Sequence, residues 1–213
     1  KILTDYYNFK TDNINFISFV IPGIIMMVVI QETFGNISGN IIWMKHYGTF
    51  QDILMSPISR IEIAISFLIS IWIIGLIIAI INLIIIHFFV QFNFYNLWRF
   101  LYYVSLTSIF FGSIGAIVGF ISYKWEKQQS FFIFFISPIS LLSGTFFSVE
   151  VLDNSWKNIF LLNPFYHLIT NVRKSFENEQ IYDFRLDIIL IIFVFSIFCF
   201  SLYIFKKGYR VID

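Results

Sequence analysis

The sequence predicts an all-α bundle of membrane-spanning helices, and its composition and the spacing of its charges are the observations that predict it. Of 213 residues, 58% are hydrophobic and 21% aromatic, whereas only 13% are charged. Soluble globular domains carry roughly twice that share of charged residues. Windows free of charge recur along the chain, and about 20 apolar residues suffice to cross the hydrocarbon core. We therefore interpret residues 1–213 as a single domain embedded in the lipid bilayer.

Five windows without Asp, Glu, Lys or Arg are long enough to span, because an ionised side chain at the bilayer centre is costly. They are residues 13–31, 63–98, 100–123, 128–149 and 188–205. The second window is too long for one helix but has no polar turn near its middle. We expect one span at about 63–87, then a short loop holding Gln91, Asn93 and Asn96.

A polar stretch, residues 48–60, follows the first span, in which Pro22-Gly23 predicts a kink. Thr49 is the expected N-cap of a short helix, and Asp52 three residues later would complete a capping box. Ser56-Pro57 should end the helix, because proline restricts the residue before it. Its apolar positions are spaced to form one edge, which could rest on lipid headgroups or fill a groove of a partner: Phe50, Ile53 and Leu54. We interpret this stretch as a surface helix on which a soluble partner docks.

Glycine and proline mark two further features. Gly112, Gly115 and Gly119 include a GxxxG pair, which favours close helix packing within one subunit, with a subunit interface as the alternative. The window 128–149 is interrupted by Ser137-Pro138 and by Ser143-Gly144-Thr145. Residues 154–176 are amphipathic and are interrupted by Asn163-Pro164, so short re-entrant or interfacial helices are expected between the last two spans.

The sequence lacks the motifs of an enzyme. It has no GxxxxGK[ST], HExxH or GxSxG motif, and its three histidines are too far apart in sequence to suggest a metal site. Its 14 basic residues are scattered, which argues against nucleic-acid binding. Glu32, Asp52 and Glu62 flank or lie in the polar stretch and are expected to be solvated or at the level of the lipid headgroups. The alternative is that Glu32 or Glu62 pairs with a basic residue of a partner. Since every predicted span is free of charge, a proton- or ion-coupled carrier is disfavoured.

The basic residues give a tie for orientation, because seven fall on each side of five spans. Residues 48–60, the loop with Lys124 and Lys127, and the tail with Lys206, Lys207 and Arg210 share one side. The basic cluster in the tail favours the cytoplasm for that side.

Four pieces of the chain resemble the permease subunits of ABC-2-type exporters, the group that includes drug-resistance, nodulation-factor and polysaccharide export permeases. The pieces occur in the order and spacing of that family and cover nearly the whole chain: residues 19–27 around Pro22-Gly23, residues 48–63, residues 141–148 and residues 162–167 followed by Arg173.

The resemblance implies six transmembrane helices in a bacterial inner membrane, both ends in the cytoplasm, two permease copies, and a separate ATPase that binds ATP and magnesium. No cofactor is then expected in this chain. Relative to the family, the first helix and the segment before it are missing, so we expect an N-terminally truncated domain. The residues matching the ATPase-coupling region are Gly48, Thr49, Phe50, Asp52, Leu54, Pro57 and Arg60. Those matching the re-entrant region are Pro138, Gly144, Asn163 and Pro164.

The function that the resemblance implies is ATP-driven export of a drug, lipid or lipid-linked glycan, with hydrolysis on the partner. A secondary carrier and a non-transporting anchor that recruits a soluble enzyme are the alternatives. A neighbouring reading frame that encodes an ATPase would favour the exporter.

Overall fold

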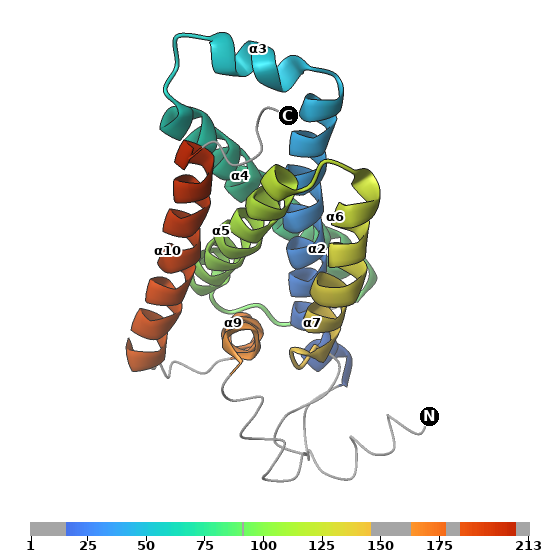
Figure 1. Ribbon diagram of the computed structural model, residues 1–213. Coiled ribbons are helices and arrows are strands. Elements are labelled where there is room, and N and C mark those ends of the chain that lie inside the picture. Colours follow the sequence, from blue (N-terminus) through green and yellow to red (C-terminus); the bar gives the residue numbers. More distant parts are fainter. Residues whose placement is uncertain (1–15, 91, 146–162, 178–183, 208–213) are drawn as a thin grey trace.

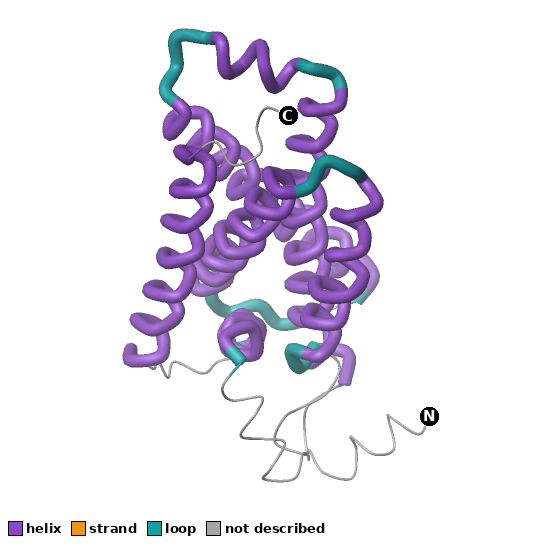
Figure 2. Tube along the Cα trace, viewed as in Figure 1, coloured by secondary structure: helices purple, strands orange, loops and turns teal. Residues whose placement is uncertain are grey.

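All regular elements are helical in the part of the chain that the computed structural model describes, residues 16–90, 92–145, 163–177 and 184–207 (Figures 1 and 2). This confirms the predicted all-α membrane bundle. The elements are α2 (Phe16–His46), α3 (Thr49–Met55), α4 (Arg60–Phe89), α5 (Leu97–Ile121), α6 (Trp125–Phe131), the π-helix η1 (Phe132–Ile136), α7 (Ser137–Leu142), α9 (Pro164–Arg173) and α10 (Phe184–Lys207).

Four of the described helices are long and apolar enough to cross a membrane: α2, α4, α5 and α10. The most buried of them is α5, which lies at the centre and packs against the other three. The outer faces of α4 and α10 carry exposed isoleucine and phenylalanine side chains, as expected for helices in contact with lipid.

The predicted C-terminal end of the first span is wrong. The window without charge stops at Gln31, but α2 continues for fifteen further residues through Glu32 to His46. Glu32 therefore lies near the middle of α2 and not beyond its end. The helix also runs on through Pro22, and Gly23 allows the turn after α7 to approach, since a Cβ there would lie 2.7 Å from the Thr145 carbonyl oxygen.

The predicted window 128–149 contains three consecutive helical segments, α6, η1 and α7, which run beside α2 (Figure 1). π-Helical turns are rare, and those that occur often lie at functional sites. The helix ends at Leu142, and the turn that follows includes Gly144 at φ 81°. Residues 146–162 lie outside the described residues, so the count of five spans and the first predicted interfacial helix stay predictions.

Glycines set the closest approaches between the spanning helices. A Cβ on Gly115 would lie 2.7 Å from the Phe34 carbonyl oxygen on α2, and one on Gly119 would lie 3.1 Å from the Ser38 Cα. Gly112 lies against Ile71 of α4. All three glycines of the GxxxG region thus pack against helices of the same chain.

The end of the molecule opposite α3 is held together by buried polar contacts. Arg173 of α9 donates from Nε to the Phe19 carbonyl oxygen at 3.2 Å and from NH2 to the Gly144 carbonyl oxygen at 2.9 Å. Its guanidinium also lies 3.6 Å from the centre of the Phe19 ring. The Tyr103 hydroxyl donates to Asp187 and thereby joins α5 to α10. The contacts of Arg173 tie α9 to the start of α2 and to the turn after α7.

Candidate functional site

The short helix α3 lies across one end of the bundle, at the top of Figure 1. The C-terminal ends of α2, α5 and α10 lie at the same end, because Phe50 of α3 contacts the rings of Phe120 and Phe205. The three segments expected on one side of the membrane are therefore at one end of the molecule: residues 48–60, the α5–α6 loop and the end of α10.

The start of α3 differs from the prediction by one residue. The N-cap is Gly48 at φ 77°, a left-handed conformation that glycine adopts readily, and Thr49 is the first residue of the helix. The Thr49 hydroxyl donates to the Met44 carbonyl oxygen at 3.3 Å, so it does not cap α3. The predicted end is confirmed, since α3 stops at Met55 and Ser56 is extended before Pro57.

A capping box does exist one helix later. The Ser59 hydroxyl accepts from the Glu62 backbone N–H at 3.3 Å, and the Glu62 carboxylate accepts from the Ser59 N–H at 2.9 Å, which starts α4. The pattern Ser-x-x-Glu before an apolar run is the sequence signal that identifies this cap.

The apolar edge of α3 faces its own bundle, which corrects the interpretation that it contacts lipid or a partner. Phe50 is only 1% exposed, and Ile53 and Leu54 are half-buried against the same hydrophobic cluster. A short helix with a fully buried aromatic anchor is attached firmly to the spanning helices, so movement of α3 would be passed to α5 and α10.

The opposite face of α3 and the turn after it are open to solvent. Met55 is 83% exposed, and the other exposed side chains of this outer face are Gln51, Asp52, Pro57, Ile58 and Arg60. Of the predicted coupling residues, Asp52, Pro57 and Arg60 are thus accessible. Phe50 and Leu54 attach the helix to the bundle. Gly48 lies in the preceding turn, and Thr49, the first residue of α3, is exposed.

A polar groove of about 420 Å³ runs between α2 and the α6–η1 segment. We call it the α2 groove. It is lined by Gln31, Glu32, Gly35, Asn36, Gly39, Asn40 and Trp43 of α2 and by Trp125, Gln128, Gln129 and Phe132 of α6 and η1. Charge-based span prediction missed it, because the i, i+4 spacing of its polar residues becomes visible only if α2 is continued past Glu32.

Three of the five amide groups around the α2 groove donate hydrogen bonds to oxygen atoms of the same chain. Gln31 donates to the Ser140 hydroxyl at 3.2 Å, Gln128 to the Ser38 hydroxyl at 3.0 Å, and Asn36 to the Glu32 carboxylate at 3.0 Å. Ser38 itself donates to the Phe34 carbonyl oxygen at 2.6 Å, so it must accept from Gln128. This fixes the orientation of the Gln128 amide.

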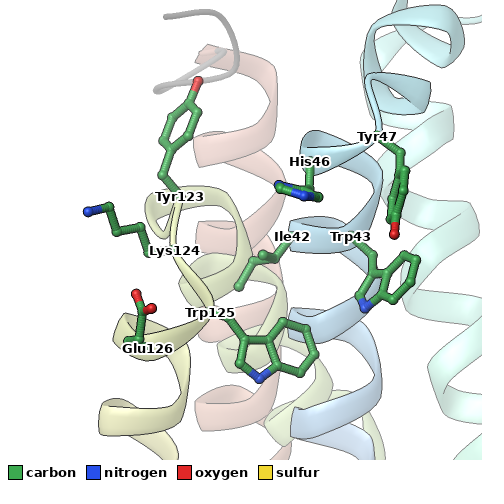
Figure 3. A pocket seen from close by; sticks show the side chains of 8 residues that line it. All are labelled: Ile42, Trp43, His46, Tyr47, Tyr123, Lys124, Trp125 and Glu126. Carbon is green, nitrogen blue, oxygen red and sulfur yellow. The ribbon is translucent and has the colours of Figure 1, made fainter.

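Towards α3, the α2 groove continues into a pocket of about 520 Å³ that shares Trp43 and Trp125 with it. We call its aromatic lining the aromatic mouth: Trp43, His46, Tyr47, Tyr123 and Trp125. Figure 3 shows Trp43 and Tyr47 on one side and Trp125 across from them, while Lys124 and Glu126 extend away from Trp43 and Tyr47. The Trp43 and Tyr47 rings are stacked at 4.6 Å.

Lys45 holds the helices behind the aromatic mouth together. Its Nζ donates to the Gly119 and Phe120 carbonyl oxygens at 3.1 and 2.5 Å, at the C-terminal end of α5. A cation at this position satisfies carbonyl groups that lack a partner within the helix and complements the helix dipole.

The predicted re-entrant residues lie at the end opposite α3. Pro138 is in the first turn of α7, Gly144 is in the turn after it, and Asn163-Pro164 starts α9, with the Asn163 side chain accepting from the Phe165 N–H at 3.0 Å. The Asn163-Pro164 interruption is thus a helix start. Whether this region re-enters the membrane stays a prediction.

Comparison with known proteins identifies the family. The sequence model of the ABC-2 type transporter family matches residues 2–176. The chain is 26% identical over 201 residues to the inner membrane transport permease YadH of Escherichia coli K12 and to YadH of Shigella flexneri, covering 92% of this chain and 78% of each relative. No solved structure matches significantly. The chain therefore belongs to the ABC-2 type transporter family: it is a multi-pass transport subunit of the inner membrane and not itself an enzyme, and the family implies an ABC ATPase as the partner that hydrolyses ATP.

Proposed function

We propose that this chain is the permease subunit of an ATP-driven exporter and that the α2 groove is part of its translocation pathway. The observation that carries the proposal is the polar face of α2. Polar and charged side chains in a spanning helix are costly against lipid, and they usually face a water-filled cavity or the interior of a bundle. The α2 groove puts a carboxylate and five amide side chains on one surface within the length of a spanning helix.

A second copy of the chain is the proposed cover of this surface. Two permease copies related by a twofold axis would bring their α2 grooves face to face around a central pathway. Such a pathway would take up a drug, a lipid or a lipid-linked glycan at the α3 end, and the aromatic mouth would be its opening.

The outer face of α3 is the proposed contact with the ATPase. Its exposed polar residues stand at the end of the bundle, and the buried ring of Phe50 links them to α5 and α10. We propose that a displacement of α3 by the ATPase is transmitted through Phe50, Phe120 and Phe205 to these two helices. The α3 end is then the cytoplasmic end.

Co-purification with the cognate ABC ATPase tests this proposal. Asp52→Lys and Arg60→Glu reverse exposed charges on the outer face without disturbing the buried face of α3. We expect each variant to lose at least about tenfold in ATPase affinity, because an electrostatic mismatch across an interface costs several kcal/mol.

Lys127→Glu is the matched control, since Lys127 is also exposed but belongs to α6. It should retain the ATPase. Equal retention of the ATPase by all four proteins, the wild type included, would remove the outer face of α3 from the coupling mechanism. A protein that binds no ATPase at all would contradict the exporter and favour the carrier or the anchor.

A further inference from the structure

The carboxylate of Glu32 is unusual in its position. It lies near the middle of α2 and is exposed in the α2 groove, and it accepts from Asn36 Nδ2 at 3.0 Å, its one polar contact among the described residues. Ionisable residues within spanning helices are rare, and they commonly mark substrate or ion pathways. No residue in the groove lining carries a positive charge that could pair with the Glu32 carboxylate.

The neighbouring amides offer oxygen atoms. Because Gln31, Asn36 and Gln128 each use their NH2 group on a protein oxygen, their carbonyl oxygens remain as acceptors. Gln128 is only 2% exposed, yet its Oε1 is buried without a hydrogen-bond partner, although the residue lines the groove. A buried acceptor without a donor costs about 1–3 kcal/mol.

The charge of the α2 groove and its hydrogen-bond acceptors both favour a positively charged hydrogen-bond donor as the ligand. Glu32 is the one ionisable residue among the residues that line it, and the oriented amides add acceptors. An anionic group such as a phosphate would find a like charge. An ammonium group carries three donors and no acceptor, so it matches the site.

The shape and the aromatic residues favour an organic cation over a bare metal ion. The groove has a volume of about 420 Å³, within the range of small-molecule sites. Trp43 and Trp125 line the groove at its junction with the aromatic mouth, and indole rings attract cations over their faces. Among the described residues, no group of three or more His, Cys, Asp and Glu lies together that could hold a metal ion.

We propose that the α2 groove binds an amphipathic organic amine, with its ammonium group at Glu32 and its apolar part against Trp43 and Trp125. This inference rests on the proposed function, because it names the substrate class of the proposed pathway. It narrows the expected substrates to those with a positively charged amine.

An equilibrium binding experiment tests the proposal without the ATPase. The full-length permease in lipid nanodiscs is titrated with dansylcadaverine, a fluorescent primary amine, and with its N-acetylated form, which has lost the charge but keeps the dansyl group. We expect the amine to bind at least about tenfold more tightly than the acetylated form. Glu32→Gln should abolish that preference, and Glu32→Asp should keep it.

Glu62→Gln is the control for a lost carboxylate outside the groove and the aromatic mouth, because glutamine can keep the capping box of α4, and it should leave binding of the amine within about twofold, because exposed charges are strongly screened. Equal affinity of the wild type for the two forms of the probe would overturn the proposal. So would an unchanged preference in Glu32→Gln. Displacement of the amine by millimolar sodium chloride but not by choline chloride would assign the site to an alkali cation and would also overturn it.

The experiment separates this inference from the proposed function. Binding of the amine is measured without ATP or ATPase, so a failure of coupling leaves it unchanged. Conversely, an ATPase that docks on α3 while the amine does not bind would retain the exporter and remove only the substrate class.

Discussion

At the scale of single residues, Phe50 shows how burial changes a functional interpretation. A phenylalanine on a short polar segment between spans suggests a contact with a partner, yet its ring is enclosed by Phe120 and Phe205 of the same chain. Phe50 is thus an anchor that positions α3, and the exposed residues around it are the ones available for docking.

Phe50→Ala should therefore lower the stability of the protein. Truncating a buried phenylalanine costs about 3–5 kcal/mol, because packing is lost and a cavity remains. The measurement is the thermal unfolding of the purified permease in detergent. Met55→Ala on the exposed face of α3 should change the stability by no more than about 0.5 kcal/mol, and equal effects of the two variants would contradict the buried anchor.

Arg173 is the corresponding residue at the opposite end. Its guanidinium reaches two carbonyl oxygens and stacks on the Phe19 ring, and a lysine cannot do all three. Arg173→Lys should lose about 1–3 kcal/mol, because a buried carbonyl oxygen is left without its donor. Thermal unfolding of this variant beside Lys174→Arg, a change at the half-buried neighbour, measures the effect. An Arg173→Lys variant as stable as the wild type would show that the guanidinium geometry is not needed.

At the scale of helices, the apolar windows of the sequence were sufficient to predict the bounds of α4, α5 and α10, but not those of α2. The first three have boundaries close to the predicted spans, because their charges lie at the membrane ends. At Glu32 the charge does not end the helix, and the carboxylate lies in the α2 groove. A charge in a sequence therefore marks the end of a helix only where no groove can receive the side chain.

Other features of the helices could be predicted only in part from the sequence. The GxxxG spacing located a close approach of α5, whereas the partner helix could not be inferred from one sequence. The burial of the α3 apolar edge depends on Phe120 and Phe205, which are distant in sequence. The α2 groove combines residues from α2 with residues of the α6–η1 segment, so its lining required the fold.

Gly75 of α4 tests the crossing of three helices. A Cβ there would lie 2.1 Å from the Ser108 hydroxyl oxygen on α5 and 2.9 Å from Thr33 Cγ2 on α2. Gly75→Ala should lose about 1–3 kcal/mol through overpacking, despite the better helix propensity of alanine.

Gly35→Ala is the matched control, since a Cβ at Gly35 of α2 meets nothing within 4 Å. It should be neutral, or more stable by up to about 1 kcal/mol. The comparison uses thermal unfolding of both variants. A Gly75→Ala protein that is as stable as Gly35→Ala would mean that the crossing is looser than described.

At the scale of the whole molecule, function follows from the separation of its two ends. The α3 end has an exposed surface of charged and polar residues, on which we propose that the ATPase docks, while the α9 end is fixed by Arg173 and by the bond between Tyr103 and Asp187. The α2 groove is lined by the C-terminal half of α2, the helix that leads to the α3 end (Figure 1). The central claim is that this groove faces a water-filled pathway and not lipid.

Cysteine accessibility tests that claim most directly. In a Cys199→Ser background, single cysteines replace Asn36 in the α2 groove and Ile80 on the exposed face of α4, and a charged, water-soluble methanethiosulfonate reagent is applied to the permease in proteoliposomes. We expect rapid modification at position 36 and none at position 80, because a thiol in lipid cannot ionise or meet the reagent. Equal protection of both positions would place the α2 groove in lipid or in a dry interface and would contradict the proposed pathway.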